Sequence, residues 1–473
     1  MQYNKSTNKN KVIFHIDFNS YFATVEQQAN PRLRGKPIGV TGGDRMKRTV
    51  IGAASVEAKK YGVKTGMQIW EAKKLCPDLI LVAGDSDKYL ETTKRFLNIL
   101  KDVSPYVEVF SIDEVFLEIP CESSWSETKL SDRILASRDS ISTACQSAYS
   151  LLISPSDFQN DMVRIAENIK SRIKSEIGEW ITCSIGISYN KRMAKLAGSL
   201  QKPDGLVIIE DEEAAMFILD RIELDEICGI GFRIKNRLNS MGVYSFSDLR
   251  KVPLAALLAS FKSYGQILYN MARGIDESLV NPFYEKEEVK SIGHRHTIDH
   301  DTSDLEEIKQ ILLKLTELIA RRLRAKKLVG KTVSCYFRYA TLNRHPELDS
   351  GSQKKMPKQV RHDGGFEGMG MQLTIPLSDD GLEIFKASWK AFHSMWSGDR
   401  IRMVGISISN LRLKIPQTLS LLPETNRQER IIKALDQINN KYGEFTLQRG
   451  ILLGTVKFRR MANSFLSDRR FKL

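Results

Sequence analysis

Three acidic residues lie in otherwise apolar segments, where an isolated carboxylate is costly to bury. Asp17 closes the segment VIFHIDF, and Asp113 and Glu114 interrupt VEVFSIDEVFLEI at 107–119. Neighbouring side chains of a strand point to opposite faces, so Asp113 and Glu114 can serve one site only across a turn. Three carboxylates together could hold two divalent cations, which activate a hydroxyl and stabilise a leaving oxygen. Taken singly, each acid is better explained as a polar residue at the end of a strand.

The segments around these acids predict the elements that would position them. The apolar run at 12–18 indicates a buried strand, a helix should follow at 20–28, and 107–119 indicates strand, turn and strand. Alternating apolar residues at 181–187 predict another strand, which the basic helix KRMAKLAGSL at 191–200 follows. Together they predict an α+β fold in which helices cover a sheet with antiparallel strands.

The chain has 473 residues, which is too many for a single hydrophobic core, so several domains are expected. Residues 211–275 read as short helices, and 276–289 are polar enough for a linker. Residues 290–415 predict a β-α-β-β-α-β unit, whose first helix should begin at a capping box of Ser303 and Glu306.

Three stretches fall outside these elements. Residues 121–158 are rich in serine, and 342–368 are rich in glycine, proline and charge, so both are expected to loop out as insertions. Residues 416–473 predict a C-terminal tail with one amphipathic helix and a basic end.

The net charge of +14, from 71 basic against 57 acidic residues, favours a polyanionic partner. Nucleic acid is a better candidate than an anionic membrane, and a merely basic soluble protein is the alternative. No apolar run approaches the roughly 18 residues of a membrane span, and the polar N-terminus lacks the centre of a signal peptide. We expect a cytoplasmic monomer without a membrane anchor.

Two segments carry a family resemblance. IDFNSYFATVE at 16–26 and SIDEVFLEI at 111–119 resemble the first two motifs of Y-family translesion DNA polymerases. Further similar segments follow in the family's order: ANPRLRGKPIGV, EAKKYGVKTGM, SIGISYNKRMAKLAGSLQKPDGL and VKSIGHRHTI. The resemblance covers roughly residues 11–415, and several ordered motifs are more specific than one short pattern.

The resemblance implies a right-hand polymerase that transfers a nucleotide from a dNTP to a primer 3′-hydroxyl and releases pyrophosphate. It also implies low fidelity and no proofreading. The ranges expected from it are palm at 1–34 and 86–210, fingers at 35–85, helical thumb at 211–275, and little finger at 290–415.

Carried over residue by residue, Asp17, Asp113 and Glu114 match the family's catalytic carboxylates. Together with the backbone carbonyl of Phe18, they would hold two Mg²⁺ ions. These four residues make up the metal site that the resemblance implies.

Four other residues match contacts to the incoming nucleotide. Phe22 falls on the steric-gate position against the sugar, and Tyr21, Lys59 and Lys202 on the substrate-binding positions around it. Without the motif, Phe22 would read as an ordinary core aromatic. Lys195 is expected to be a solvated charge on its helix.

The chain departs from the family pattern at three positions. Val56 and Lys59 stand where many members carry a tyrosine and an arginine that contact the triphosphate. Lys59 keeps a cation but loses the two-pronged guanidinium. Asn19 replaces an aspartate seen in many members, so the branch of the family stays open.

Primer–template DNA is the expected macromolecular partner. Gly229 and Gly231 resemble a helix-hairpin-helix, in which backbone N–H groups approach a phosphate. The possible phosphate contacts of the little finger are Lys290, Arg295, Arg338 and Arg412, each of which could equally be a solvated charge. The segment Gln417–Leu422 resembles a peptide that docks on a sliding clamp, and the alternative is an extended linker without a binding role.

Two other classes of function remain possible from the residues alone. A non-catalytic polymerase-like scaffold at damaged DNA would lose the carboxylates, and this chain keeps all three. A two-metal nuclease would need clustered acids but neither the steric-gate motif nor the little finger. A primer-extension assay separates these alternatives from a polymerase.

Overall fold

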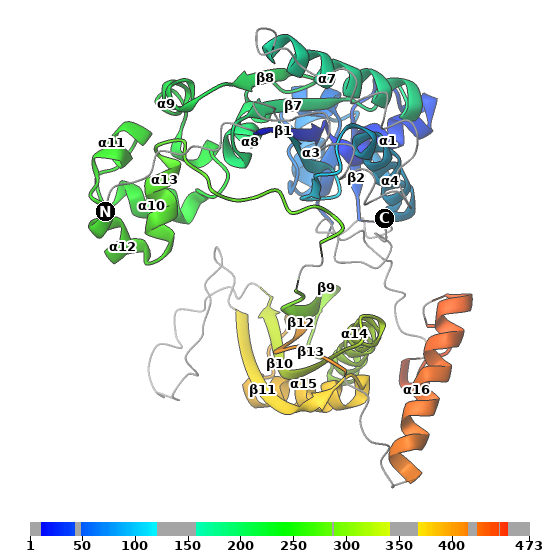
Figure 1. The fold of residues 1–473 in the computed structure, drawn as a ribbon. Coiled ribbons are helices and arrows are strands. Elements are labelled where there is room, and N and C mark those ends of the chain that lie inside the picture. The colour runs from blue at the N-terminus through cyan, green and yellow to red at the C-terminus, as the bar shows by residue number, and fades with distance from the viewer. Residues whose placement is uncertain are drawn as a thin grey trace, which may run out of the picture. The chain divides into compact units, whose positions relative to one another are not determined.

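The computed structural model describes residues 11–42, 49–120, 158–285, 288–340, 368–414, 423–443 and 445–452. The chain divides between residues 286 and 287 into two compact units, drawn in Figure 1. Almost all of the two predicted insertions, 121–158 and 342–368, lies outside the described residues, as does Gln417–Leu422. Within the described residues, no helix has the length and apolar character needed to cross a membrane.

The first unit contains a five-stranded sheet in the order β5-β6-β1-β7-β8. Strand β1 lies at its centre and pairs antiparallel with both β6 and β7. The strands are β1 (Lys11–Phe18), β5 (Val107–Val109), β6 (Glu114–Pro120), β7 (Cys183–Ser188) and β8 (Leu206–Ile209). The predicted strands around the three acids are therefore confirmed, and so is the turn between β5 and β6.

The alternation of β1 divides its side chains between the two faces of the sheet. Phe14, Ile16 and Phe18 lie in the main core, which also includes residues of α1 (Tyr21–Ala29), α4 (Ser86–Val103) and α7 (Phe158–Arg172). Ile13, on the other face, packs with residues of β6 and α8. His15 and Asp17 share the parity of Ile13, so the sheet directs them toward α8.

Helix α8 (Lys191–Leu200) crosses this second face at very short range. A Cβ added to Gly186 of β7 would lie 2.1 Å from both the Ala194 carbonyl oxygen and the Gly198 nitrogen. No residue other than glycine fits there without displacing the helix. The close approach brings the side chains on the rim of α8 to the ends of β1 and β6.

Two smaller regions complete the first unit. A three-stranded sheet is formed by β2 (Ile38–Thr41), β3 (Ile51–Ala54) and β4 (Ile80–Ala83), with α2 (Val56–Lys60) and α3 (Ile69–Leu75) beside it. Short helices share a separate core with α8. They are α9 (Glu212–Leu219), α10 (Phe232–Asn239), α11 (Phe246–Lys251), α12 (Leu254–Phe261) and α13 (Tyr264–Met271).

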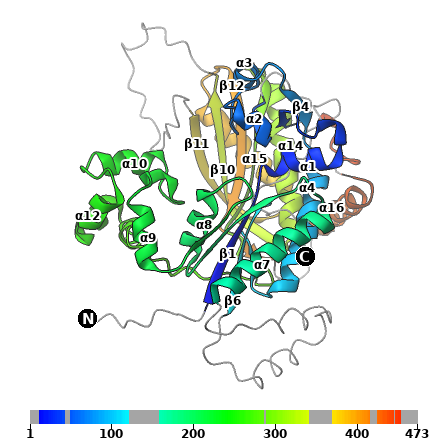
Figure 2. The ribbon, with the colours of Figure 1, turned by 90° about the horizontal axis from the view of Figure 1, so that it is seen from above.

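The second unit confirms the predicted β-α-β-β-α-β order, with a sheet arranged β11-β10-β12-β9. Helices α14 and α15 pack together and share one core with the inward residues of the sheet. Strands β10, β11 and β12 of this sheet are labelled in Figure 2. The elements are β9 (Ser291–Thr302), α14 (Leu305–Ala325), β10 (Leu328–Tyr339), β11 (Gly368–Ser378), α15 (Gly381–Met395), β12 (Ile401–Ser409) and β13 (Arg412–Leu413).

The first helix of this unit does not begin as the capping box predicts. Asp304 is the N-cap residue of α14, and its carboxylate accepts a hydrogen bond from the Glu306 backbone N–H at 2.9 Å. Aspartate is at least as good an N-cap as serine, so the helix starts one residue later than Ser303 would allow.

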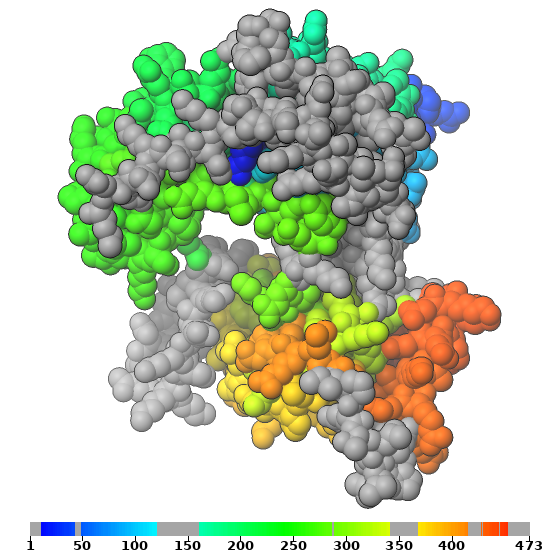
Figure 3. All heavy atoms as spheres, viewed as in Figure 1, coloured from blue at the N-terminus to red at the C-terminus, as the bar shows by residue number. Residues whose placement is uncertain are grey.

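The C-terminal segment packs against the second unit rather than standing apart from it. Helix α16 (Pro423–Tyr442) lies against the surface of this unit in Figure 3. Asp436 of α16 accepts two hydrogen bonds from Arg324 of α14, at 2.6 and 2.9 Å. Arg449 donates to Glu317 at 2.7 Å, and Leu452 is buried. The described part of the predicted tail, residues 423–443 and 445–452, therefore belongs to this unit.

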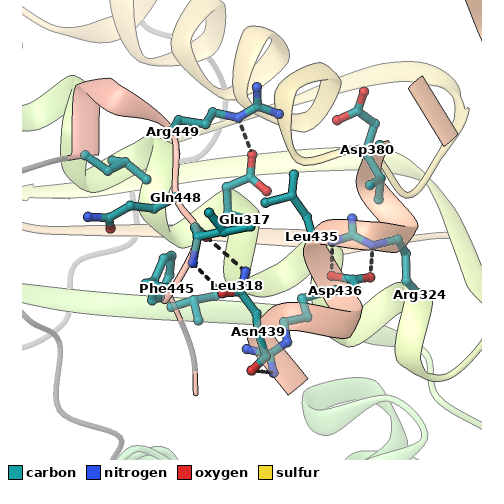
Figure 4. A pocket seen from close by; sticks show the side chains of 14 residues that line it. Glu317, Leu318, Arg324, Asp380, Leu435, Asp436, Asn439, Phe445, Gln448 and Arg449 are labelled. Atoms are coloured by element: carbon teal, nitrogen blue, oxygen red, sulfur yellow. Dashed lines mark hydrogen bonds and ion pairs between the residues drawn. The ribbon is translucent and has the colours of Figure 1, made fainter. Parts of the chain in front are cut away.

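A cavity of about 270 Å³ lies between α14, α16 and residues 445–452 (Figure 4). Arginine and carboxylate side chains pair across its wall, and Lys314 is buried beneath Phe445 with its Nζ 5.1 Å from the ring centroid. Two partly buried ion pairs, Arg324–Asp436 and Arg449–Glu317, thus help to hold residues 423–443 and 445–452 in place.

We predict that Asp436→Asn lowers the free energy of unfolding of the second unit by about 1–3 kcal/mol, because the partly buried Arg324 guanidinium loses its carboxylate partner. Thermal unfolding measured by calorimetry tests this. Glu429→Gln on the same helix is the matched control, since its pair with Lys414 is exposed. Equal melting temperatures for Asp436→Asn and the wild type would show that the pair does not hold the tail.

Candidate active site

The strand register brings the three sequence-predicted carboxylates together. Asp17 of β1 pairs directly with Glu114 of β6, and the Phe18 N–H donates to the Asp113 carbonyl at 3.0 Å. A tight turn precedes Glu114, whose carbonyl accepts from the N–H groups of Phe110 and Ser111. This turn places Asp113 beside the end of β1, near enough for Asp17 and Glu114 to influence its charge.

The proximity of these charged groups shifts the pKa values of Asp113 and Glu114 in opposite directions. Burial raises the pKa of Asp113, and the negative charges of Asp17 and Glu114 add to the effect, while the Ser111 hydroxyl, which donates to Asp113, opposes it. Burial would also raise the pKa of Glu114, but neighbouring His15 and Lys195 outweigh it and lower this pKa to about 2. Glu114 is therefore ionised at neutral pH.

Two lysines neutralise this acidic cluster. Lys195 of α8 forms an ion pair with Glu114, and the Lys202 Nζ lies 2.5 Å from Asp17 Oδ2. The sequence-based expectation for Lys195 was wrong, because its side chain is only 21% exposed and faces the carboxylates. The small residues of α8 were the available signal, since they indicate a helix packed tightly on a sheet with its flanking lysines at the rim.

His15 is a second residue that sequence reasoning missed. It is buried on the same face of β1 as Asp17, and its Nε2 lies 3.6 Å from Glu114 Oε1. Burial lowers the pKa of His15, which favours the neutral ring, and its face contacts Phe116 at 4.9 Å between ring centroids. A histidine two residues before a site aspartate, within a strand, was the signal for it.

The donor atoms suit a hard divalent cation. Ligand atoms of His15, Asp17 and Glu114 all lie within 4.8 Å of one another. Asp113 adds a third carboxylate close by, and carboxylate and carbonyl oxygens are the ligands that Mg²⁺ prefers. The carboxylates of Asp17, Asp113 and Glu114 therefore fit a hard divalent cation such as Mg²⁺.

Positive charge extends from the carboxylates toward α2. Partial burial and repulsion from Lys202 lower the pKa of Lys59, while Asp17 opposes them, so the three charges lie close together. The loop that carries Lys202 is fastened to α7 and its extension, because Lys170 donates to the Asp204 carbonyl at 2.5 Å. Two sequence-predicted substrate lysines therefore converge beside Asp17.

Helix α1 places its aromatic residues differently. Phe22 is half-buried and stacks on Tyr89 with ring centroids 4.4 Å apart. Tyr21 is buried, and its hydroxyl bonds to Thr93 and to the Tyr89 carbonyl at 2.7 and 2.8 Å. Any contact of Tyr21 with a nucleotide would therefore come from its backbone.

The side-chain amide of Asn19 makes two hydrogen bonds that suit an asparagine at this position. Its Nδ2 donates to the Thr182 hydroxyl at 3.1 Å, and its Oδ1 accepts from the Ser184 hydroxyl at 3.0 Å. An aspartate could accept the second bond but could not donate the first. This departure from the family pattern therefore fastens the start of α1 to β7.

The predicted helix-hairpin-helix glycines lie in one turn before α10. Gly229 has a φ of 114°, a conformation that favours glycine, and Gly231 is the N-cap residue of α10. The Tyr264 hydroxyl donates to the Gly229 carbonyl at 2.8 Å, which holds the turn in place.

In the second unit, the predicted basic residues separate into two groups. Arg295 of β9 and Arg338 of β10 lie on the face of the sheet opposite the helices, where the Arg295 guanidinium carbon is 5.6 Å from the Tyr336 ring centroid. Lys290 and Arg412 are exposed near the other end of the strands. The structure thus does not gather all four on one patch.

Comparisons with known proteins agree with this geometry. A model described as the impB/mucB/samB family matches residues 16–199, and that family's C-terminal domain matches 289–430. A model described as the DNA polymerase-iota thumb domain matches 225–276.

Curated relatives match almost the whole chain. The DNA polymerase IV of Moorella thermoacetica is 33% identical over 449 residues, which span 93% of this chain and 96% of the relative. That of Pelotomaculum thermopropionicum is 32% identical over 443 residues, 93% and 95% of the two chains. The solved structure of a Y-family DNA polymerase chimera has the same fold, with a TM-score of 0.61 at 22% identity over 85% of this chain and 99% of that one.

The chain belongs to the Y-family (impB/mucB/samB) of DNA polymerases. It is a DNA-directed DNA polymerase of the translesion class, so the recognition made from the sequence is confirmed.

We predict that Asp113→Asn and Glu114→Gln shift stability in opposite directions in metal-free buffer at pH 7. The pKa of Asp113 is raised, so its charge opposes folding and the amide should raise Tm by a few degrees. The pKa of Glu114 is lowered from 4.5 to about 2, so its charge stabilises the fold above pH 4.5, and the amide should lower Tm.

Thermal unfolding of both variants from pH 7 down to pH 2 provides the measurement. The Glu114→Gln deficit should shrink as pH falls from 4.5 toward 2, because the wild type loses its contribution there. Shifts of the same sign at pH 7 would contradict the assigned charges.

Proposed function

We propose that this polymerase works by a two-metal transfer of a nucleotide from a dNTP to the primer 3′-hydroxyl, with pyrophosphate released. The observation that supports this is the convergence of Asp17, Asp113 and Glu114 at the ends of two neighbouring strands. When bound there, two Mg²⁺ ions would activate the hydroxyl and stabilise the leaving oxygens.

The chain's own residues contribute position and charge. Lys202 and Lys59 lie beside Asp17, where they would neutralise the triphosphate of the incoming nucleotide. Helix α1 begins four residues after Asp17, and the first N–H groups of a helix are left free to bind a phosphate. The N–H groups of the helix are fixed before substrate arrives, so they can bind a phosphate with little reorganisation.

Phe22 is proposed to select the sugar. It lies in the first turn of α1, five residues after Asp17, and its half-buried ring is held by stacking on Tyr89. A rigid ring at this place admits a 2′-hydrogen but clashes with a 2′-hydroxyl.

The DNA is proposed to lie against two separate surfaces. The Gly229–Gly231 turn would bind a phosphate of the duplex through backbone N–H groups, and the sheet face with Arg295 and Arg338 would contact other phosphates. Lys290 and Arg412 would add charge near the other end of that sheet.

Other properties are proposed from the family resemblance, namely low-fidelity synthesis without proofreading by a cytoplasmic monomer. The relatives' name, DNA polymerase IV, favours that branch over others of the family. Binding of a sliding clamp through Gln417–Leu422 is part of the proposal but rests on the sequence of that segment alone. The intact carboxylate cluster argues against a non-catalytic scaffold.

We predict that the double variant Asp113→Asn with Glu114→Gln abolishes primer extension while DNA binding stays close to the wild type. Both changes keep the side-chain volume and remove the charge that would hold Mg²⁺. Extension of a labelled primer and fluorescence anisotropy with the same duplex give the two readouts. Extension at the wild-type rate would exclude these carboxylates as the active site.

We predict that Phe22→Ala raises ribonucleotide incorporation by orders of magnitude, because the clash with the 2′-hydroxyl disappears with the ring. The measurement is the ratio of rNTP to dNTP incorporation, beside a melting curve. Tyr89→Phe is the control, since it keeps the stacked ring and removes only the hydroxyl that bonds Glu26. A Phe22→Ala variant with lower Tm but the wild-type ratio would make Phe22 a core residue.

A further inference from the structure

Two carboxylates of the proposed metal site already have lysine partners. Lys195 forms an ion pair with Glu114 Oε1, and Lys202 lies 2.5 Å from Asp17 Oδ2. A divalent cation on either oxygen would lie next to an ammonium group, and like charges at such distances repel strongly where water is scarce. Lysine and metal therefore compete for the same oxygens.

The competition is strongest at Glu114. Both side chains of its pair are largely buried, with 21% of Lys195 and 17% of Glu114 exposed, whereas Lys202 is 41% exposed. Low exposure reduces screening by water, so the Lys195 pair is harder to displace than a surface pair. Moving Lys195 away thus requires something that compensates its charge.

The surroundings of Lys195 show where it can move. Its Nζ lies 4.9 Å from the centroid of the Phe110 ring, which is 43% exposed and belongs to the turn that carries Asp113. An aromatic face stabilises an ammonium group without fixing it to one direction. Nζ already lies against this ring while it is paired with Glu114, so a rotation of the lysine side chain about the ring would release Glu114 and keep the contact with the aromatic face.

We propose that Lys195 is an exchangeable counter-ion of Glu114, which passes from this carboxylate to a phosphate of bound DNA when DNA and metal bind. The proposal rests on the two-metal function above and assigns Lys195 a regulatory, positioning part in it. While Lys195 occupies Glu114, it lowers the affinity of the free enzyme for a divalent cation. A DNA phosphate that attracts Lys195 frees the carboxylate, so DNA and metal strengthen each other's binding.

The same helix provides a matched control. Lys191 lies one turn before Lys195, pairs with both oxygens of Glu108 at 2.7 Å, and has its Nζ 4.9 Å from the Phe116 ring centroid. Its surroundings repeat those of Lys195, but Glu108 is outside the proposed metal site. Lys191→Met removes an equivalent charge and ion pair without touching Glu114.

The test measures Mn²⁺ binding to the full-length protein by electron paramagnetic resonance, with and without primer–template DNA and without nucleotide. Lys195→Met should bind Mn²⁺ about fivefold or more tightly than the wild type without DNA, and should lose most of the gain that DNA produces. Lys195→Arg, which keeps the charge, and Lys191→Met should both retain that gain.

Wild-type or weaker Mn²⁺ affinity in DNA-free Lys195→Met would overturn the proposal. Lys195→Gln provides the same comparison if the methionine variant fails to fold, as judged by its melting curve. The double variant Asp113→Asn with Glu114→Gln distinguishes a failure of the proposed metal site from a failure of the counter-ion role of Lys195. If it binds Mn²⁺ and extends primers like the wild type, the metal site is wrong; if it loses both while Lys195→Met behaves as the wild type, only the counter-ion role fails.

Discussion

The electrostatic cost of gathering carboxylates at the ends of two paired strands governs the rest of this structure. Asp17, Asp113 and Glu114 lie within range of one another in a partly buried place, and burial raises the pKa of Asp113. Lys195 and Lys202 offset the charge, and each comes from a segment distant in the chain. Strands β1 and β6 provide the acids, while α8 and the loop after it provide the compensation.

The arrangement depends on how closely α8 approaches the sheet. Gly186 and Gly198 remove the side chains that would otherwise separate helix from strand, and this closeness lets Lys195 reach Glu114. The opposite face of the same sheet is an ordinary apolar core with three helices. One face of β1 therefore supplies stability, and the other supplies the charges that chemistry requires.

Sequence periodicity was sufficient for the strands and the β-α-β-β-α-β unit, because each of these is a local pattern, whereas the three carboxylates were assigned to one site only through the family resemblance. It failed for Lys195, whose partner lies 81 positions away, since a pattern along one helix does not reveal which strand the helix will face. His15 was overlooked although the period of two places it on the same face of β1 as Asp17, because an apolar strand gives no sign of which face receives a helix. The docking of α16 through Arg324 and Asp436 likewise depends on contacts 112 positions apart.

Helix α8 also gives Met193, Leu196 and Ala197 to the core that it shares with helices α9 to α13. The helix thus lies between the helical region and the catalytic strands and contributes side chains to both cores. Any displacement of α8 together with the helical region would change the separation of Lys195 and Glu114, so the position of that region and the charge balance of the acidic cluster are linked through one helix.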